Sequence, residues 1–351
     1  MVKRTYSFGI IGTGMIANFH ADAIQSIGNA NLATCMDVSK ERVDSFSATY
    51  GCQGYTALKD MLEHPGLDIV TKCTPSGMHL EAAIACAKAG KHMIIEKPLE
   101  ITIERCDRII EEAEKQHVLV AGIFPSRFHQ MSQIVKQAID SNRLGKITLA
   151  DAYVKWFRNQ EYYDTGGWKG TWKFDGSGAL MNQSIHAIDL LQWFMGPVSQ
   201  VNSFCSTIAH KNIEVEDTAV AILHFSSGSL GVVEGTTAAY PGFLKKLEIT
   251  GSEGSIVIEE ENITVWQFSK ELPEDEAIRK KYASVTETGG GAGDPKAIGS
   301  HGHQLQFKDM IEALEAGRQP FVDGREARKA VEIIQGIYLS AKQKQTVPLP
   351  L

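Results

Sequence analysis

The fold of this 351-residue chain is indicated most clearly by one stretch, Phe8-Gly-Ile-Ile-Gly-Thr-Gly-Met-Ile-Ala17. Its apolar start has the pattern of a short strand, and its second part has the G-x-G-x-x-A spacing of a dinucleotide-binding turn that opens a helix. Gly12 permits the tight turn, Gly14 lets the main chain approach a pyrophosphate, and Ala17 lets the helix pack closely on the strand. The stretch therefore predicts a parallel α/β sheet that binds a dinucleotide.

An acidic residue follows at the place where such a site needs one. Asp37 ends the second apolar run, Leu32 to Met36. A carboxylate there accepts hydrogen bonds from both ribose hydroxyls and repels a 2′-phosphate, which predicts NAD as the cofactor. Arg42 lies close enough in sequence to leave NADP open. Taken alone, Asp37 could also be a solvated acid or a cap for the next helix.

Residues 1–124 alternate short apolar runs with amphipathic helical stretches. The runs are Tyr6 to Ile11, Leu32 to Met36, Asp68 to Cys73, His92 to Ile95 and Val118 to Phe124. Alternation of strand and helix at this spacing is typical of a parallel sheet covered on both faces. We therefore expect an NAD-binding Rossmann domain, a doubly wound parallel sheet, over residues 1–124.

Residues 125–351 carry longer strand-like segments joined by hairpin signals. They predict an α+β domain with a large, mostly antiparallel open sheet. We expect a helix from Gly178 to Met195 on this sheet, a mobile loop over residues 270–299, and a last helix, 325–343, that packs back towards the N-terminal domain. A sheet covered on one face leaves the other needing cover, which predicts a homodimer or homotetramer.

Composition excludes several classes of partner and compartment. The formal net charge of −7 disfavours nucleic acid and anionic lipid. No apolar run reaches the roughly 18 residues of a membrane-spanning helix, and no signal peptide is indicated. The six cysteines contain no C-x-x-C pair and are expected to be reduced thiols, so the protein is predicted to be soluble and cytoplasmic. No metal site is expected, because His301-Gly-His303 lacks a third ligand at recognisable spacing.

Two further strand ends are candidates for chemistry, because ligands of open α/β sheets bind beyond the carboxyl ends of the strands. They are Cys73-Thr-Pro75 and Glu96-Lys97-Pro98. An ammonium at Lys97 can hydrogen-bond a substrate hydroxyl and stabilise its developing charge. The alternative is a surface lysine before a proline turn.

An aromatic stretch from Trp156 to Trp172 includes Arg158 and Lys169. Aromatic faces stack on sugar rings, and guanidinium groups bind hydroxyls or phosphates, so a sugar-binding wall is one reading of this stretch. A subunit interface is the other, since interfaces are also enriched in aromatics and Arg. His303, near the start of a helix, is a candidate polar contact for the substrate.

Taken together, the Gly-rich turn, Asp37, Cys73-Thr-Pro75, Glu96-Lys97-Pro98 and the segment from Gly178 to Asp189 resemble the glucose-fructose oxidoreductase/inositol dehydrogenase/MocA family. The resemblance covers essentially the whole chain, and the aromatic stretch is similar to the branch acting on glycosides and nucleotide sugars, including 3-dehydrogenases. It implies that Lys97 and His186 are catalytic. Expected substrate-binding residues are Asn182, Arg158, Tyr163, Trp168, Trp172 and His303. Expected cofactor-binding residues are Gly12, Thr13, Gly14, Met15, Ile16, Asp37, Arg42, Thr74, Pro75, His79, Glu96 and Lys97.

One position departs from the family pattern. Inositol dehydrogenases usually carry an aspartate four residues before the histidine, where this chain has Asn182. Asn182 can orient a hydroxyl or an imidazole but cannot be a base, so the proton acceptor is expected to be His186 or Lys97. The alternative for His186 is a core histidine bonded to Asp189.

The sequence thus predicts an NAD-dependent oxidoreductase that transfers hydride between nicotinamide and a secondary hydroxyl or ketone of a sugar, glycoside or nucleotide sugar. One alternative keeps NAD tightly bound and gives net epimerisation, hydrolysis or elimination. Another is a non-catalytic sugar or dinucleotide sensor on the same fold.

Overall fold

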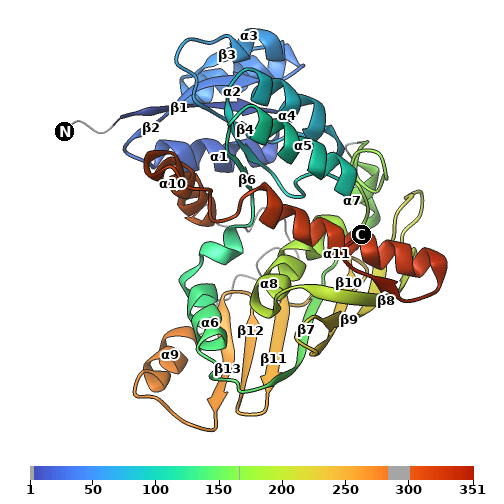
Figure 1. The fold of residues 1–351 in the computed structure, drawn as a ribbon. Coiled ribbons are helices and arrows are strands. Elements are labelled where there is room, and N and C mark those ends of the chain that lie inside the picture. The colour runs from blue at the N-terminus through green and yellow to red at the C-terminus, as the bar shows by residue number, and fades with distance from the viewer. Residues whose placement is uncertain (1–3, 166, 284–300) are drawn as a thin grey trace. The chain divides into compact units, whose positions relative to one another are not determined.

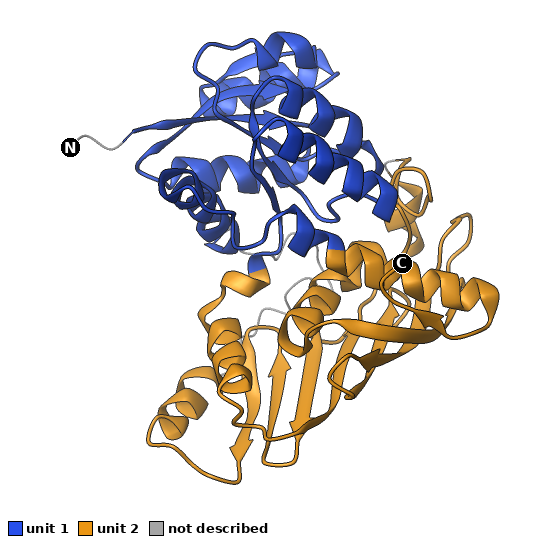
Figure 2. Cartoon of the chain, viewed as in Figure 1, with its two compact units in different colours: residues 1–125, 299–328 blue, residues 126–298, 329–351 orange. Residues whose placement is uncertain are grey.

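The computed structural model describes residues 4–165, 167–283 and 301–351. The chain forms two compact units (Figure 2): unit 1 contains residues 1–125 and 299–328, and unit 2 contains residues 126–298 and 329–351. The first crossing lies next to the predicted boundary at residue 124. The predicted domains differ from these units in one respect, because the chain returns to unit 1 over residues 299–328.

Unit 1 is built on a six-stranded parallel sheet with the order β3-β2-β1-β4-β5-β6 (Figure 1). Right-handed crossovers on either side of β1 and β4 put helices on both faces of such a sheet and place the ligand site where the order reverses. The strands are β1 (Tyr6–Ile11), β2 (Ala30–Met36), β3 (Gln53–Tyr55), β4 (Ile69–Lys72), β5 (His92–Ile95) and β6 (Val120–Gly122). The helices are α1 (Met15–Gln25), α2 (Lys40–Tyr50), α3 (Leu58–Leu62), α4 (His79–Lys88), α5 (Ile103–Lys115) and α10 (His301–Ala316).

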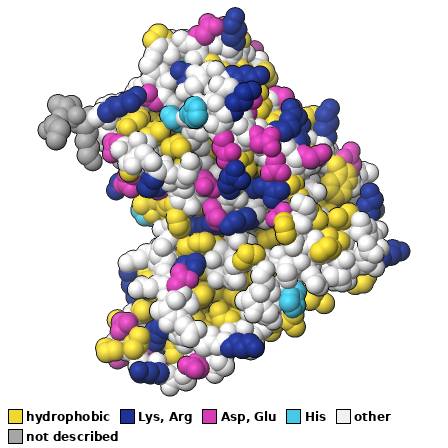
Figure 3. Space-filling view, in the orientation of Figure 1, with side chains coloured by type: hydrophobic (Ala, Val, Ile, Leu, Met, Phe, Trp, Pro, Cys, Tyr) yellow, Lys and Arg dark blue, Asp and Glu magenta, His cyan; other side chains and the backbone are white. Residues whose placement is uncertain are grey.

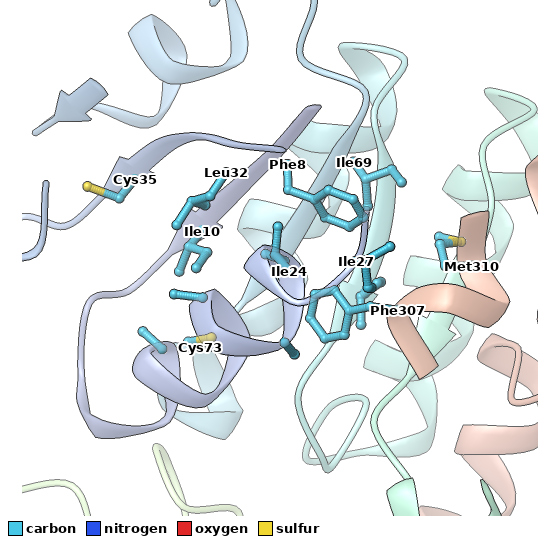
Figure 4. Packing of buried hydrophobic residues seen from close by; sticks show 14 of the residues in the cluster. Phe8, Ile10, Ile24, Ile27, Leu32, Cys35, Ile69, Cys73, Phe307 and Met310 are labelled. Carbon is cyan, nitrogen blue, oxygen red and sulfur yellow. The ribbon is translucent and has the colours of Figure 1, made fainter. Parts of the chain in front are cut away.

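Helix α10 belongs to unit 1 because its apolar face completes the core there. Phe307 and Met310 are fully buried and lie with Phe8 and Ile24 in one hydrophobic cluster (Figure 4). The Phe307 ring lies 5.7 Å from that of Phe8. Helix α10 therefore packs on the core of unit 1, and the last helix also meets the N-terminal domain as predicted, at its start, where Arg325 and Arg328 pair with Glu114 and Asp107 of α5.

Unit 2 is built on an eight-stranded sheet with the order β13-β12-β11-β7-β10-β9-β8-β14 (Figure 1). Strands β7 and β10 pair in parallel, and the other neighbours pair antiparallel. The strands are β7 (Ile147–Lys155), β8 (Val198–Ser206), β9 (Thr218–Phe225), β10 (Leu230–Thr236), β11 (Lys246–Gly251), β12 (Gly254–Glu259), β13 (Asn262–Phe268) and β14 (Val347–Pro348). This is the predicted large, mostly antiparallel sheet.

The helices of unit 2 include α6 (Gln130–Asp140), α7 (Gln160–Asp164), α8 (Ile185–Met195) and α9 (Asp275–Tyr282). One face of the unit 2 sheet is buried, and of these helices α8 contacts β7 and β11 and α9 contacts β13. Helix α11 (Gly324–Gln343) packs on β8 through Ser203, whose amide donates to Ser340 Oγ at 3.1 Å and whose hydroxyl donates to Ile337 O at 2.6 Å. Part of the predicted loop 270–299 is therefore helical as α9, and residues 284–299 of it lie outside the described residues.

The predicted helix Gly178 to Met195 begins with a π-helical turn, η3 (Ala179–Ser184), before α8. A carboxylate lies at its start, where Glu216 accepts hydrogen bonds from the Gly178 and Leu180 amides at 3.1 and 2.9 Å. A Cβ at residue 178 would lie 1.7 Å from Glu216 O, so only glycine fits there. The turn widens the helix at the residues that the sequence singled out.

The other face of the unit 2 sheet exposes apolar side chains. Phe204, Val220, Ile222, Leu149 and Leu230 are 80, 44, 56, 41 and 49% exposed. Phe204 pairs with Val220 across β8 and β9, and Leu230 pairs with Leu149 across β10 and β7. These five residues form an apolar row, called the open face below.

In the described part of the chain, no helix has both the length and the apolar character needed to span a bilayer.

Candidate functional site

The Gly-rich turn of unit 1 has the shape that a bound pyrophosphate requires. Gly12 has φ +87°, and a Cβ there would lie 2.9 Å from Cys73 O, so this position needs glycine. Gly14 is exposed at the start of α1, and a Cβ there would meet nothing within 4 Å. The space beside the first amides of α1 is thus open to an anion.

Asp37 lies at the end of β2 against the same turn. Its Oδ2 accepts from the Thr13 amide at 3.0 Å, and its Oδ1 accepts from the Ser39 amide at 3.0 Å and from Arg42 Nη2 at 2.7 Å. Burial alone would raise the pKa of Asp37, but these donors lower it below its ordinary value. Asp37 is therefore a carboxylate, the form that accepts from ribose hydroxyls.

The loop after β4 offers an unused donor. The Thr74 hydroxyl is buried and has no hydrogen-bond partner among the described residues. Thr74 and Pro75 are half-buried at the carboxyl end of the strand next to β1. A buried hydroxyl without a partner costs free energy unless a ligand satisfies it. Together with the open space at Gly14 and the carboxylate of Asp37, it fits a dinucleotide.

His79 was expected to bind the cofactor, and the structure buries it completely. Its ring nitrogens face main-chain oxygens, with Nε2 3.1 Å from Thr74 O and Nδ1 3.0 Å from Pro98 O. The side chain therefore joins the loop after β4 to the loop after β5.

Glu96 ends β5 in a buried cluster with His20 of α1 and His303 of α10. Its Oε1 lies 2.8 Å from His20 Nε2 and 3.6 Å from His303 Nε2. Two ligands of a tetrahedral zinc, each about 2.1 Å from the ion, lie about 3.4 Å apart, so the shorter separation is that of a hydrogen bond. Burial would raise the pKa of Glu96, but the two histidines hold it well below its ordinary value. The cluster is thus an imidazole–carboxylate network.

Through this network Glu96 fixes the main chain at Lys97. The second carboxylate oxygen, Oε2, accepts from the Lys97 amide at 3.0 Å. The Lys97 side chain is half-buried. His303, expected to contact the substrate, is instead 3% exposed beside Glu96, in unit 1.

In unit 2, Asn182 and His186 stand apart from their neighbours. Between Asp175 and Gln192, all of which the structure describes, these two residues alone keep half-buried surface, while every other residue is buried. They lie about one helical turn apart, on η3 and α8. This pattern differs from that of a core histidine, which would be buried with the rest.

Asp189, the partner proposed for a core His186, has a different role. Arg127 binds it in two places, with Nε 2.9 Å from Oδ2 and Nη2 2.7 Å from Oδ1. Both side chains are 1% exposed. This buried pair anchors α8 to the segment before α6.

The aromatic stretch divides into buried and exposed residues. Arg158 and Tyr163 are 5 and 6% exposed. Arg158 lies over the Trp156 and Tyr162 rings, and Tyr163 Oη lies 2.8 Å from Thr237 Oγ1. Trp168 is half-buried, and Trp172 is 46% exposed with its ring edge against Tyr338. The two tryptophans therefore keep surface available for a ligand.

Sequence reasoning missed three polar residues near the expected site residues. His20 lies on the buried side of α1, and the order of the sheet brings it to Glu96. Asp175 accepts from Asn182 Nδ2 at 2.9 Å, and Glu216 supports η3 from 38 residues away. His20 could have been found from the sequence, because it is a polar residue on the apolar face of a predicted helix. The contacts of Asp175 and Glu216 depend on tertiary structure and leave no such signal.

The structure thus assembles the expected residues into two groups. Unit 1 holds the expected cofactor residues, Lys97 and His303. Unit 2 holds His186, Asn182, Arg158, Tyr163, Trp168 and Trp172.

Comparison with known proteins identifies both halves. Residues 6–124 match the oxidoreductase family with an NAD-binding Rossmann fold, and residues 132–257 match the GFO/IDH/MocA C-terminal domain. The WlbA dehydrogenase from Bordetella pertussis, solved with NADH and UDP-GlcNAcA, is 32% identical, with a TM-score of 0.91 over 100% of this chain and 99% of that chain. The WlbA dehydrogenase from Chromobacterium violaceum is 33% identical, with a TM-score of 0.90 over 100% and 98% of the two chains.

Among curated proteins, the myo-inositol 2-dehydrogenase of Thermotoga maritima is 28% identical over 97% of this chain and 98% of its own length. These matches confirm the family, the fold class, NAD as the cofactor and the oxidoreductase class that the sequence predicted. This chain is a member of the GFO/IDH/MocA family of NAD-binding oxidoreductases.

Proposed function

We propose that this protein is a sugar dehydrogenase that oxidises a secondary hydroxyl of a nucleotide sugar, with Lys97 and His186 handling the hydroxyl proton. The observation that carries the proposal is the half-buried pair Asn182 and His186 in an otherwise buried segment. Whole-chain similarity to two WlbA dehydrogenases, solved with NADH and UDP-GlcNAcA, favours a nucleotide sugar over a free sugar.

The chemistry assigns different tasks to the two residues. The bound NAD supplies the acceptor for the hydride. A base must take the hydroxyl proton as the hydride leaves, and a cation must stabilise the negative oxygen. We assign the base to His186 and the cation to Lys97, whose main chain Glu96 holds at 3.0 Å. Trp168 and Trp172 offer faces for the sugar ring.

The test is a substrate screen with purified protein. NADH formation is measured with NAD and UDP-GlcNAcA, myo-inositol or levoglucosan. Turnover of UDP-GlcNAcA supports the nucleotide-sugar assignment, and turnover of myo-inositol alone would restrict the proposal to free sugars. Binding of UDP-GlcNAcA without NADH formation, together with recovered UDP-GlcNAcA whose mass and NMR spectrum are both unchanged, would favour a sensor instead, because hydrolysis and elimination change the mass and epimerisation changes the spectrum.

Cofactor preference follows from Asp37. We expect NAD to bind at least tenfold more tightly than NADP, about 1.4 kcal/mol, because the carboxylate faces the position of a 2′-phosphate. Arg42, bound to Asp37 at 2.7 Å, reduces the repulsion without removing it. The Asp37→Ala variant should narrow the difference. Titration of both nucleotides by fluorescence measures it, and equal dissociation constants in the wild type would contradict this role of Asp37.

Partners and compartment are also proposed. The described cysteines Cys35, Cys52, Cys73, Cys86, Cys106 and Cys205 are free thiols, which supports a cytoplasmic location. On the face drawn in Figure 3, Lys and Arg side chains are interspersed with Asp and Glu rather than gathered in one patch. With the net charge of −7, this supports a small-molecule substrate rather than a nucleic acid.

The open face predicts self-association. A homodimer or homotetramer that packs sheet against sheet would cover Phe204, Val220 and Ile222. Sedimentation velocity at micromolar concentration should show an oligomer, and Phe204→Asp should shift it towards monomer because it buries a charge in an apolar contact. Lys211→Asp, at an exposed position outside the open face, is the control and should leave the oligomer unchanged. A wild-type monomer would contradict the prediction.

A further inference from the structure

His79 lies fully buried at the start of α4, between two loops that carry expected site residues. On one side, its Nε2 lies 3.1 Å from Thr74 O, in the loop after β4. On the other side, its Nδ1 lies 3.0 Å from Pro98 O and 3.3 Å from Leu99 O, in the loop that follows Lys97. All three partners are carbonyl oxygens, which can only accept a hydrogen bond.

The ring has too few protons to bind both loops. Burial and the charge of Lys72 lower the pKa of His79 below its ordinary value, and the opposing effects of Glu100 and of the carbonyl oxygens do not reverse this shift. Lys72 is itself fully buried and donates from Nζ to His79 O at 2.9 Å. Burial lowers the pKa of Lys72 to about 8, so it is still largely a cation at about pH 7. The imidazole beside it is therefore neutral and carries one N–H, which leaves a lone pair on the other nitrogen.

The carbonyl oxygens decide which ring nitrogen of His79 keeps the proton. A proton on Nδ1 is shared with two oxygens and leaves the Nε2 lone pair opposite one oxygen, that of Thr74. A proton on Nε2 would leave the Nδ1 lone pair opposite the oxygens of both Pro98 and Leu99. A lone pair and a carbonyl oxygen repel each other, so the tautomer with the proton on Nδ1 has the lower energy.

A second contact joins the start of α4 to the same loop after β5. The Leu80 amide donates to Glu100 Oε1 at 3.1 Å. Arg105 of α5 holds that carboxylate as well, with Nη2 2.8 Å from Oε1. The start of α4 thus supports this loop at Pro98 and again at Glu100.

We propose that His79 is a positioning residue for Lys97, which keeps its one proton on Nδ1 and uses it to hold the main chain directly after the lysine. Glu96 accepts from the Lys97 amide, so the main chain is then fixed on both sides of the lysine side chain. The loop after β4 receives no proton from this ring and can adjust to the dinucleotide. Its Thr74 hydroxyl has no hydrogen-bond partner among the described residues. This inference rests on the proposed function, because it explains how the lysine assigned to the reacting hydroxyl is held.

Neutron diffraction locates the proton directly. The crystals are grown with NADH at about pH 7 from protein expressed in D₂O, so that buried N–H groups carry deuterium. We expect deuterium on Nδ1 of His79 and none on Nε2. Deuterium on Nε2 alone, or on both nitrogens, would overturn the inference. The result does not depend on turnover of any substrate.

Two amide substitutions at His79 separate the roles of its ring nitrogens. The side-chain NH₂ of asparagine takes roughly the place of Nδ1, and that of glutamine takes roughly the place of Nε2. His79→Asn keeps a donor to Pro98 O, so its kcat should stay within about threefold of the wild type. His79→Gln directs its donor to Thr74 O instead, and its kcat should fall roughly tenfold because Pro98 O loses its partner.

The substrate for these measurements is UDP-GlcNAcA or myo-inositol, whichever yields NADH with the wild type. His117→Asn makes the same substitution at an exposed position of unit 1, where asparagine tolerates the φ of 55°, and should not change kcat. Circular dichroism verifies that each variant is folded.

A merely structural role of His79 predicts the opposite order of the two variants. If the ring only filled space, the smaller asparagine would leave the larger cavity and would impair the protein more than glutamine. The inference is therefore wrong if folded His79→Asn turns over as slowly as His79→Gln or more slowly. Failure of the proposed function is distinguishable, because the wild type would then produce no NADH with either probe, whereas the position of the deuterium would still be measured.

Discussion

Replacing Lys97 or His186 by alanine is expected to lower kcat by roughly 10²- to 10⁴-fold while the affinity for NADH changes little. Under the proposed function, each variant removes a group that acts on the reacting hydroxyl, and this is the usual range for a positioned acid, base or cation. Neither change touches the Gly-rich turn or the Asp37 contacts that fit the dinucleotide. The measurements are steady-state NADH formation and a fluorescence titration with NADH.

The two variants should differ in their pH profiles. If His186 is the base, the loss of kcat/KM at low pH, where the imidazole is protonated, disappears in His186→Ala and persists in Lys97→Ala. The reverse result assigns the base to Lys97. Lys88→Ala, at an exposed position in unit 1, serves as a control. Near-normal turnover in both active-site variants would exclude these residues and favour other side chains.

His20 and His303 suggest why Lys97 can be effective at the end of a strand. Their imidazoles keep Glu96 ionised, and Glu96 fixes the main chain at the lysine. Under the proposed function, a fixed main chain reduces the number of conformations from which the Lys97 side chain must reach the hydroxyl, as in a preorganised site.

The fold of unit 1 was predictable because its strands are nearly continuous apolar runs that end at glycine or proline signals. The short strand Gln53–Tyr55 has no such run and was not predicted. Helix α10 was assigned to the second domain because a helical pattern indicates which face is apolar but not what covers it. Phe307 packs against Phe8 across 299 positions, and no local pattern encodes that contact.

The candidate site shows the same limit. The positions of Lys97 and Asp37 just after strand ends were predictable because each follows an apolar run, and Asp37 also lies the expected distance after the Gly-rich turn. Asp175 was missed because Gly176 and Gly178 separate it from the helical pattern that contains Asn182. The sequence therefore does not show that Asp175 and Asn182 are in contact. His79 was expected to touch the cofactor, since the sequence places it in the loop but does not show that its ring faces inward.

Glu216 carries the last prediction, which concerns stability. It is 5% exposed and accepts from the Leu180 and Gly178 amides and from Tyr338 Oη at 2.8 Å. Burial nevertheless dominates and raises the pKa of Glu216 to about 7. A carboxyl whose pKa is raised on folding stabilises the protein fully below its unfolded pKa of 4.5, and this contribution is lost as the pH rises to about 7.

Glu216→Gln should therefore remove a pH dependence rather than simply weaken the fold. Between pH 5 and 8, the free energy of unfolding of the wild type should fall by about 3 kcal/mol relative to the variant, because glutamine does not ionise. Urea unfolding followed by tryptophan fluorescence measures this in unit 2, since all five tryptophans lie there. Glu214→Gln, an exposed change two residues earlier, should leave the pH dependence intact. A constant difference between wild type and Glu216→Gln over this range would mean that the buried carboxyl keeps its ordinary pKa, and that its three donors fully offset the cost of burying the charge.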